Sequence, residues 1–435
     1  MNKEFHKKQN FFSFSDIDSE RKDRIMKFTS TEATPAPHVP PGVLRLTGAA
    51  KEDIPMYHIQ TMNKISPVGL NRFPSELYEV GDAVQDPQGI LVRSAKLLDL
   101  EFNPSLLAIA RAGVGVNNIP LDRCAAAGIP VFSTPGANAN AVKELVICAM
   151  LMGSRDIPGA IRWVREQAAS GVDVSTVVEK GKSAFIGPEL YKKTLGIIGL
   201  GAIGSIVANT AISLGMDVYG YDPFLSVDTA LRLDRHVHVV KDINDLYKRS
   251  DYITMHIHYT EKTAHMIDAD AIAAMKRGVR VINLARGEIV DDEAMLTALD
   301  TGMVAAYITD FPNNRLLTAP HVIAMPHLGA STPESEQNCA AMAVDTLRDY
   351  LESGNIRSSV NLPEMTMDRS GVQRLCVLHK NVPGMLANIT SLFGRDGVNV
   401  ENLSNKSRGD YAYTMVDLGS KVGDNVIEDV RRTAN

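Results

Sequence analysis

The sequence predicts an α/β protein organised around a parallel sheet, and three observations support this. From about residue 195 onward, short β-branched runs alternate with segments of helical character. Several of these helical segments are closed by Gly, a common C-terminal cap. Strands that alternate with helices form βαβ units, whose sheet is covered on both faces. A chain of 435 residues is also too long for one ordinary domain, so two or three compact units are expected.

The composition is that of an ordinary globular protein, with 45% hydrophobic and 22% charged residues. A net charge of −6 argues against a nucleic-acid partner. The best apolar run, 145–154, is roughly half of what a bilayer requires, so no membrane partner is predicted. Four cysteines lie far apart without zinc spacing, which predicts reduced thiols in a cytoplasmic protein and no metal site.

Residues 1–55 differ in composition from the rest of the chain. Their mixed charge and a Thr/Pro/Ala stretch predict a disordered extension, or an upstream start codon chosen in place of Met56. Four acidic residues in the extension argue against a mitochondrial presequence: Asp16, Asp18, Glu20 and Asp23. The stretch that begins at Met56 is typical of a first β-strand.

Residues 56–136 alternate in the same way, with weaker strands in 89–94 and 106–112, and predict a second α/β domain. A long helical pattern at 138–155 leads into the central domain, and another occupies 333–352. A polar connector, 359–371, follows. The last segment, 372–435, has a β–α–β–β–α pattern.

A glycine-rich turn marks the start of the central domain. Gly199, Gly201 and Gly204 form a GxGxxG that follows the strand LGII and opens a helix, so the context is that of a dinucleotide-binding, Rossmann-type βαβ unit. The first glycine permits the tight turn, the second lets the backbone approach a pyrophosphate, and the third allows close helix packing. Ala202 and Ile203 begin the helix, whose N-terminal N–H groups would bind the phosphates.

Asp222 ends the next predicted strand and is placed to accept hydrogen bonds from the adenosine ribose hydroxyls. A carboxylate at this position repels a 2′-phosphate, and the stretch YDPFLS offers no Arg or Lys to reverse that preference. The predicted cofactor is therefore NAD rather than NADP.

Two further motifs make the resemblance specific: INLARGEIVD at 282–291, and AMPHLGAST at 324–332. With the glycine-rich turn they resemble the D-2-hydroxyacid dehydrogenase family, from Met56 to about residue 360. The resemblance implies a Rossmann-type, doubly wound nucleotide domain (137–327) inserted in a flavodoxin-like substrate domain (56–136, with 328–358 returning to it). The active site is then expected between the two domains.

The same resemblance implies the catalytic residues. Arg286 would bind the substrate carboxylate and polarise the 2-oxo group, which suits a guanidinium because its planar fork makes two hydrogen bonds to a carboxylate. His327 would be the general acid/base for the substrate oxygen. The structural alternatives, a surface ion pair for Arg286 and a structural imidazole for His327, are the less favoured interpretations in these motifs.

Other family contacts transfer by position. The substrate would be bound by Arg93, Ser94, Gly113 and Asn138. Arg93 and Lys96 are candidate phosphate contacts, and a solvated surface role is the alternative for Lys96. Asp310 would meet the nicotinamide carboxamide, and Gly329 belongs to the same cofactor contacts.

The chain departs from the family after Asp310. Family members usually carry a Glu here that pairs with the catalytic His and raises its pKa, whereas this sequence reads DFPNNR. Asn313 or Asn314 could orient His327, but a neutral amide cannot stabilise an imidazolium as a carboxylate does. We therefore expect a lower pKa for His327 and an acid-shifted rate profile.

The C-terminal segment resembles an ACT domain, a ferredoxin-like α+β module. His379, Asn381 and Asn399 match the residues that hold serine across a domain dimer in serine-regulated family members. The alternative is a structural or dimerisation module, favoured by the apparent lack of the last strand of the ferredoxin-like pattern, which leaves an unfilled sheet position.

Together, the resemblance implies NAD-dependent oxidation of 3-phospho-D-glycerate to 3-phosphohydroxypyruvate, the first step of the phosphorylated route to serine, with L-serine as a possible effector. Two alternatives stay open: a hydroxypyruvate/glycerate or general 2-oxoacid reductase, and a non-catalytic NAD-sensing protein. The segment 138–164 and the C-terminal module both offer interface surface by resemblance, so a homodimer or homotetramer is expected.

Overall fold

A computed structural model describes residues 25–29 and 56–434. The described residues divide into two compact units, one of which comprises Pro135–Cys339. The other takes the described residues up to Thr134 and those from Ala340 onward. Within these described ranges, no helix has the length and apolar character needed to cross a membrane.

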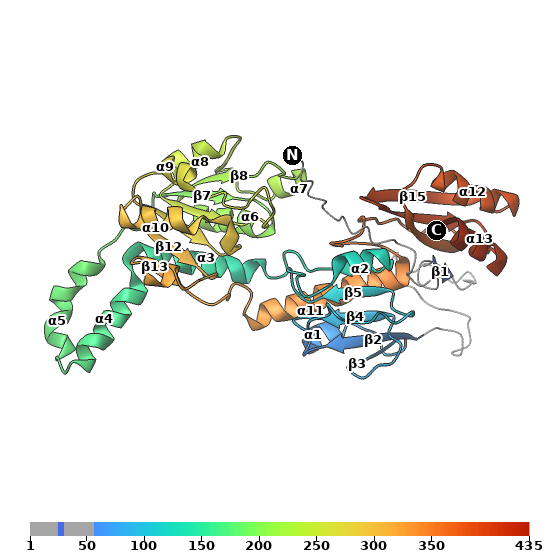
Figure 1. Cartoon of the computed structure of the whole chain (residues 1–435), viewed down its shortest axis with the longest axis horizontal. Helices are drawn as coiled ribbons and strands as arrows, with labels where there is room; N and C mark the ends of the chain where they lie inside the picture. Colours follow the sequence, from blue (N-terminus) through green and yellow to red (C-terminus); the bar gives the residue numbers. More distant parts are fainter. Residues whose placement is uncertain (1–24, 30–55, 435) are drawn as a thin grey trace, which may run out of the picture. The chain divides into compact units, whose positions relative to one another are not determined.

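The unit Pro135–Cys339 contains a seven-stranded parallel sheet in the order β13-β12-β11-β10-β7-β8-β9 (Figure 1). Counted along the chain from β7, the sheet places its first strand beside its fourth and reverses direction there, which confirms the doubly wound fold predicted from the sequence. The strands are β7 (Thr194–Ile198), β8 (Asp217–Tyr221), β9 (Val237–Val240), β10 (Tyr252–Met255), β11 (Val279–Asn283), β12 (Val304–Thr309) and β13 (Val322–Ala324).

Helices cover both faces of this sheet, each face with its own apolar core. The helices are α3 (Ala139–Arg155), α6 (Ala202–Ser213), α7 (Val227–Ala230), α8 (Ile243–Arg249), α9 (Ala269–Ala273) and α10 (Asp292–Asp300), with short turns η3 (Gly287–Ile289) and η4 (Leu316–Thr318). The Asp242, Asp268 and Asp291 carboxylates accept first-turn N–H groups of α8, α9 and α10, which fixes where these helices begin.

A helical hairpin extends from this unit, away from its sheet (Figure 1). It consists of α4 (Ile157–Ala169), α5 (Val174–Gly181) and the turn η2 (Lys182–Phe185). Asp156 allows the sharp change of direction from α3 because it adopts the left-handed conformation at φ 43° and also caps α4. No residue of α4 or α5 is buried. These helices therefore expose apolar side chains that amphipathic helices normally pack against a partner.

The first sheet of the other unit is five-stranded and parallel, in the order β3-β2-β4-β5-β6. This 2-1-3-4-5 order is that of flavodoxin-like folds and confirms the prediction. Its elements are β2 (Tyr57–Met62), α1 (Pro67–Leu70), β3 (Tyr78–Gly81), β4 (Gly89–Val92), β5 (Ala108–Arg111), α2 (Leu121–Ala126) and β6 (Val131–Phe132).

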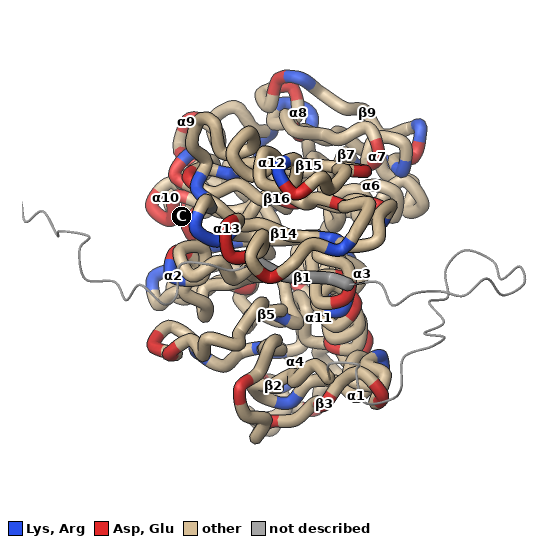
Figure 2. Tube along the Cα trace, turned by 90° about the vertical axis from the view of Figure 1, so that its right-hand side faces the viewer, with Lys and Arg blue, Asp and Glu red and all other residues tan. Residues whose placement is uncertain are grey.

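Helix α11 (Pro333–Ser353) begins in the unit Pro135–Cys339, and its later turns pack against the five-stranded sheet. Arg72 and Asp345 form an ion pair at 2.6 Å, and the Tyr78 hydroxyl donates to Glu352 at 2.6 Å. Figure 2 shows acidic and basic residues interspersed along the described trace.

The C-terminal module is a four-stranded antiparallel sheet in the order β1-β14-β16-β15. Its elements are β14 (Gln373–Lys380), α12 (Met385–Arg395), β15 (Val400–Arg408), β16 (Tyr411–Leu418) and α13 (Asp424–Ala434). Both helices pack on the face that carries Leu375, Val377 and Val416. The β–α–β–β–α pattern expected from the sequence is therefore present.

The fourth strand of this sheet comes from the other end of the chain. Strand β1 (Ile25–Thr29) pairs antiparallel with β14, from Ile25 opposite Val377 to Thr29 opposite Gln373. This corrects the expectation that the whole of residues 1–55 lacks structure; the rest of that extension lies outside the described residues. The physical reason is that β14 would otherwise present an edge of unpaired backbone groups, which attracts any segment able to form a strand.

The second face of this sheet packs against the connector and the end of α11. Arg374 and Asp417 form a buried ion pair, with Nε to Oδ1 at 2.6 Å and Nη2 to Oδ2 at 2.8 Å. Arg374 Nη1 also donates to the carbonyls of Ser353 and Met367. The C-terminal module is thus joined to the end of α11 and to the connector by these polar contacts.

Candidate active site

The glycine-rich turn joins β7 to α6 in the geometry that its glycines permit. Gly199 has φ 90°, and a Cβ there would lie 2.6 Å from the His256 carbonyl oxygen. A Cβ at Gly204 would lie 1.9 Å from the Gly199 oxygen, so only glycine allows the helix to approach so closely. Gly201 instead faces open space, since a Cβ there would have no neighbour within 4 Å. No side chain caps α6, so the N–H groups of its first turn, which contains Ala202 and Ile203, remain available for an anion.

Asp222 follows β8 and fixes the adjoining loop. Its Oδ2 accepts from the Leu200 backbone N–H at 2.9 Å, and its Oδ1 accepts from Phe224 N–H at 2.8 Å. The carboxylate therefore lies directly beside the glycine-rich turn. Carboxylate oxygens accept more than one hydrogen bond, so these contacts leave capacity for ribose hydroxyls.

Arg286 follows β11 in a loop that one buried amide holds in place. Asn283 donates from Nδ2 to the Arg286 carbonyl at 2.9 Å and accepts at Oδ1 from Ala285 N–H at 3.1 Å. Asn283 has no exposed surface, so this amide is a fixed part of the scaffold. This role of Asn283 was not predicted from the sequence, although Asn283 is the Asn of the INLARGEIVD motif that contains Arg286.

His327 follows β13, at the same carboxyl edge of the parallel sheet. Arg286 and His327 both contact Phe311, which follows β12. The Arg286 Cζ lies 5.5 Å from the centroid of the Phe311 ring, and the His327 and Phe311 ring centroids are 4.6 Å apart. Burial, and to a lesser degree the positive charge of Arg286, lowers the pKa of His327.

Asp310 lies at the end of β12, between these two residues in the strand order. Only 2% of its surface is exposed, and neither carboxylate oxygen has a hydrogen-bond partner of normal geometry. Burial raises its pKa to about 6. Gly329 lies alongside, since a Cβ there would stand 3.8 Å from Asp310 Oδ2 and 3.3 Å from Val142. Backbone N–H groups of Asp310 and Gly329 partly offset this rise in pKa. A buried carboxylate that lacks a side-chain partner is suited to a ligand that brings N–H donors, as a nicotinamide carboxamide does.

The loop after Asp310 differs from the expectation that Asn313 or Asn314 orients His327. The Asn313 amide donates to Asp292 at 2.5 Å, and its oxygen accepts from the Arg315 and Leu316 N–H groups. It therefore caps η4 and has no remaining acceptor directed at the imidazole. Asn314 is exposed. The physical reason is local, because Asn favours turns in which it bonds its own backbone two or three residues later.

The predicted substrate contacts are divided between the two units. In the flavodoxin-like sheet, Arg93 and Ser94 follow β4 and Gly113 follows β5, so all three lie at the carboxyl edge. Asn63 Oδ1 accepts from the Ser94 N–H at 3.1 Å, and Arg111 Nε donates to the Arg93 carbonyl at 3.0 Å, which holds this loop. Lys96, in the same loop, is exposed.

Asn138 belongs to the nucleotide-binding unit, immediately before α3. Its Oδ1 is buried without a hydrogen-bond partner. This acceptor is therefore open to a donor from a ligand.

The three residues matched to a serine site do not meet within one chain. His379 is buried, with Nδ1 against the Lys380 carbonyl and Nε2 against Thr414 Oγ1. Asn381 donates to the Gly409 carbonyl next to it. Asn399 lies near Leu418, at the opposite end of β16, and donates to Glu401.

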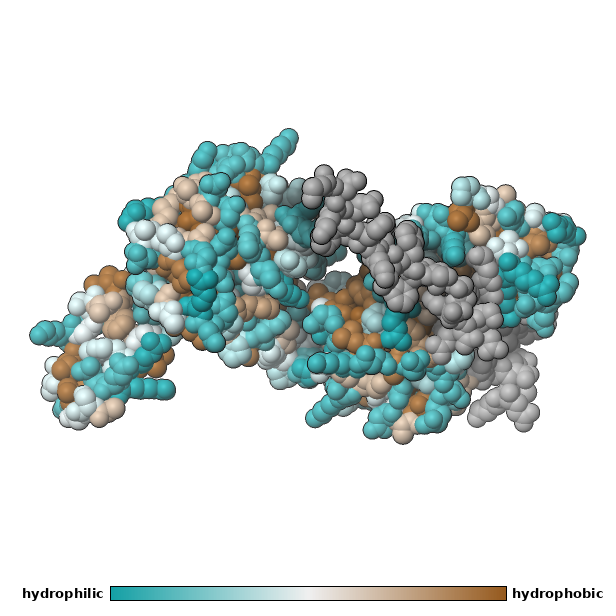
Figure 3. All heavy atoms as spheres, viewed as in Figure 1, coloured by the Kyte–Doolittle hydropathy of each residue, from teal (hydrophilic) through white to brown (hydrophobic). Residues whose placement is uncertain are grey.

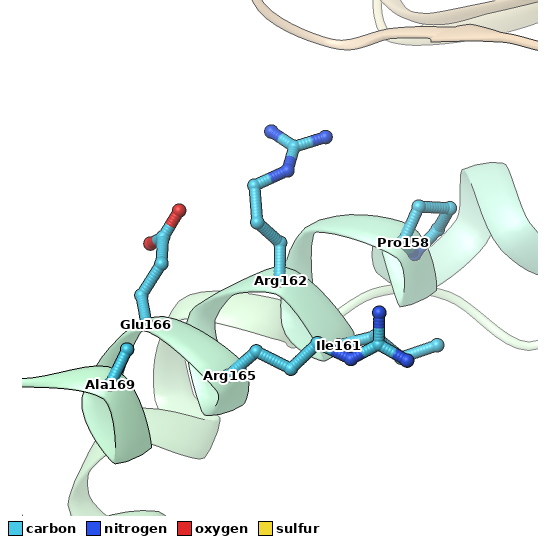
Figure 4. Close-up of a pocket in the computed structure, with 6 residues that line it drawn as sticks. All are labelled: Pro158, Ile161, Arg162, Arg165, Glu166 and Ala169. Carbon is cyan, nitrogen blue, oxygen red and sulfur yellow. The ribbon is translucent and has the colours of Figure 1, made fainter.

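A shallow groove of about 460 Å³ lies on α4, away from the proposed catalytic and cofactor residues. Figure 4 shows the residues that line it, all from this one helix: Pro158, Ile161, Arg162, Arg165, Glu166 and Ala169. Apolar side chains gather over the hairpin in the space-filling view (Figure 3). The hairpin therefore presents a mixed apolar and charged surface.

Comparison with known proteins adds a family and several relatives. Residues 147–329 match the D-isomer specific 2-hydroxyacid dehydrogenase NAD-binding domain. A D-3-phosphoglycerate dehydrogenase of Escherichia coli is 32% identical over 354 residues, which cover 78% of this chain and 82% of that protein. The enzyme of the same name from Synechocystis is 36% identical over 326 residues, covering 73% of this chain and 56% of the relative.

This chain is also similar to a solved structure. The NAD⁺-bound 3-phosphoglycerate dehydrogenase of Entamoeba histolytica superposes with a TM-score of 0.54 at 26% identity, covering 70% of this chain and 99% of that one. The chain spans only 55–60% of the length of the relatives from Synechocystis, Methanocaldococcus jannaschii and Bacillus subtilis.

Proposed function

Because this chain belongs to the D-isomer-specific 2-hydroxyacid dehydrogenase family, we propose that it oxidises 3-phospho-D-glycerate to 3-phosphohydroxypyruvate with NAD. One observation carries the proposal: Arg286, His327 and the buried Asp310 carboxylate lie at the carboxyl ends of β11, β13 and β12, which are neighbouring strands. Ligands of doubly wound folds bind at this edge of the sheet. The proposed reaction is the first step of the phosphorylated route to serine.

The residues of the nucleotide-binding unit fit NAD. The open cradle at Gly201 and the uncapped start of α6 would receive the pyrophosphate, and Asp222 would bind the ribose. Asp310 would accept the carboxamide N–H, because its buried carboxylate has no hydrogen bond from another side chain. When bound, NAD supplies the hydride acceptor.

The chain's own residues would supply the proton chemistry. Arg286 would hold the substrate carboxylate in two hydrogen bonds and place the 2-hydroxyl near His327. As the C2 hydrogen leaves with its electron pair, neutral His327 would take the hydroxyl proton, and the C2–O bond becomes a carbonyl. In the reverse direction, protonated His327 would return that proton to the oxygen.

Arg93 would contact the phosphate group, and Ser94, Gly113 and Asn138 are further proposed substrate contacts. Asn63 and Arg111 hold the backbone of the Arg93 loop, and a guanidinium is suited to a phosphate because its N–H groups can make two parallel hydrogen bonds. Relatives that carry the name D-3-phosphoglycerate dehydrogenase support the phosphorylated substrate.

The test follows NADH absorbance with 3-phosphohydroxypyruvate and, separately, with unphosphorylated hydroxypyruvate. We expect a strong preference for the phosphorylated acid and loss of turnover in a His327→Asn variant that still binds NADH. Equal use of both acids would instead assign a general 2-oxoacid reductase. NADH binding without turnover of either acid would assign a non-catalytic NAD-sensing protein.

We also propose a cytoplasmic homodimer, or a homotetramer built from such dimers. The α4–α5 hairpin supports this, because it exposes apolar side chains such as Ile161, 50% exposed, and Val164, 38% exposed. Light scattering of the purified protein would give the assembly, and a monomeric mass at micromolar concentration would contradict it.

A serine effector site belongs to the same proposal. His379 and Asn381 would act with Asn399 of the partner subunit, since the two ends of β16 separate these residues within one chain. Inhibition by L-serine that Asn381→Ala relieves would support this site. Turnover unaffected by millimolar serine would leave the module a structural or dimerisation role.

A further inference from the structure

One aromatic ring contacts both of the proposed catalytic side chains. Phe311 lies 4.6 Å from the His327 ring, centroid to centroid, with the planes tilted by 49°. The Arg286 guanidinium lies over the same ring at 5.5 Å. All three residues follow neighbouring strands of one sheet, in the unit Pro135–Cys339.

The backbone around Phe311 holds this ring in a defined place. Its N–H donates to Thr309 Oγ1 at 3.0 Å, and Thr309 is fully buried at the end of β12. On another side lies Gly287, where a Cβ would approach the Phe311 Cβ to 3.4 Å. The ring itself is half-buried. A fixed ring of this kind can restrict the rotamers of the two side chains that it contacts.

The remaining candidates for orienting His327 have other partners. Asn313 is engaged with Asp292 and with the backbone of η4, and Asn314 is exposed. Across the part of the chain that the structure describes, we find no hydrogen bond from a side chain to the His327 ring. The described contact between the His327 ring and another side chain is therefore the aromatic one to Phe311.

We propose that Phe311 is a positioning residue that holds His327 and Arg286 at their working separation, in place of a carboxylate partner for the imidazole. This inference rests on the proposed function for the roles of Arg286 and His327. An aromatic face attracts a cation weakly and offers no proton acceptor, so it orients an imidazole without forming an ion pair. Arg286 is the charged group that acts on the pKa of His327, and it acts on the pKa of Asp310 as well.

Substitutions of Phe311 test whether its aromatic ring positions His327 and Arg286. In Phe311→Leu the volume is nearly kept but the flat surface is lost, so His327 and Arg286 gain rotameric freedom. We expect kcat to fall on the order of 10- to 100-fold, because small misplacements of catalytic groups cost that much. The KM for NADH should change much less than kcat, since the glycine-rich turn and Asp222 follow other strands of the sheet. Phe311→Tyr keeps the aromatic face and should restore most of the activity.

A second variant reports on contact with His327 itself. Phe311→Glu places a carboxylate beside the imidazole and should raise the pKa of His327, because an adjacent negative charge favours the imidazolium. The acid limb of the oxidation rate, and the imidazole titration followed by NMR, should both move to higher pH, by roughly one unit. The shift would show that the side chain at position 311 lies against the imidazole, while the loss of kcat in Phe311→Leu and its recovery in Phe311→Tyr test the positioning role.

The control is Phe102→Leu, a buried phenylalanine of the flavodoxin-like unit. It should lower thermal stability without altering either pH profile. If Phe311→Leu does not fold, Phe311→Met takes its place. The proposal is overturned if Phe311→Leu keeps the wild-type kcat, or if Phe311→Glu leaves the His327 titration unmoved. The NMR titration is independent of turnover, so it tests Phe311 even if the proposed substrate is wrong.

Discussion

Two titrating residues at the carboxyl edge of the sheet have surroundings that disfavour their charged forms. Burial acts on both His327 and Asp310, but in opposite directions, because one is charged when protonated and the other when ionised. The consequences for rate and for stability therefore also have opposite signs.

For His327 the consequence is a rate profile shifted toward acid. The neutral imidazole is the base in the oxidation direction, and a pKa below the usual value of about 6.5 keeps it neutral at lower pH. We expect the acid limb of kcat for oxidation to lie below pH 6.5. The measurement is a pH–rate profile, repeated with Asp310→Asn to remove the second titrating group. An acid limb above about pH 7 would show that a carboxylate pairs with His327.

For Asp310 the consequence is a loss of stability at neutral pH. Its folded-state pKa of about 6 lies above the unfolded value of 3.8. Ionisation of Asp310 therefore lowers the free energy of unfolding as the pH rises through this window. The cost is absent below about pH 4 and complete above about 6. Asp310→Asn should therefore raise the free energy of unfolding at about pH 7.5 by roughly 1–3 kcal/mol, and by less at about pH 5. It should also weaken NAD binding. Equal stability of the two proteins at neutral pH would contradict the burial argument.

The α4–α5 hairpin exposes the apolar side chains of Ile161, Val164 and Val178. Ile161→Glu places a charge in its apolar surface, so the proposed dimer should dissociate toward monomer at micromolar concentration. Light scattering would show the change in mass. The control is Val239→Glu on β9, a similarly exposed apolar position at 47%, which should leave the mass unchanged. Loss of the dimer in both variants would argue against the hairpin as the interface.

The link between the C-terminal sheet and α11 depends on the buried Arg374–Asp417 pair. Arg374→Met leaves Asp417 buried without its cation and removes two bonds to backbone carbonyls. We expect a loss of about 3–5 kcal/mol in the free energy of unfolding. Denaturant titration measures it, and the double variant Arg374→Met/Asp417→Leu should recover much of the loss. A single variant as stable as the parent would mean that water reaches Asp417.

For the molecule as a whole, deletion of residues 1–55 tests the role of β1. The shortened chain would begin at Met56 and leave the β14 edge unpaired. Hydrogen exchange should then increase in β14, and the protein should aggregate more readily, while NADH binding is retained. The comparison is the full chain under identical conditions. Unchanged protection of β14 would show that β1 contributes nothing to the sheet.

Features that depend on local pattern could be predicted from the sequence. The glycine-rich turn, the Asp222 position and the shared sheet edge of Arg286 and His327 follow from strand–helix alternation, because parallel strands bring their carboxyl ends together. The role of Phe311 could not be predicted because its contact depends on the path of a shortened loop. The pairing of β1 with β14 could not be predicted either, because Ile25 and Val377 are far apart in the chain and no local periodicity links them.

That pairing also has a consequence for how the protein is made. Strand β1 leaves the ribosome well before Gln373–Lys380, because it precedes that strand in the chain. At about 5–20 residues per second, roughly 20–70 seconds of translation separate Thr29 from Gln373. Both parallel sheets have then been synthesised before the antiparallel sheet can be completed. The C-terminal module therefore completes its sheet only with a strand from the other end of the described chain. The pairing of β1 with β14 has a high contact order, so we expect it to be the slowest step in forming this sheet.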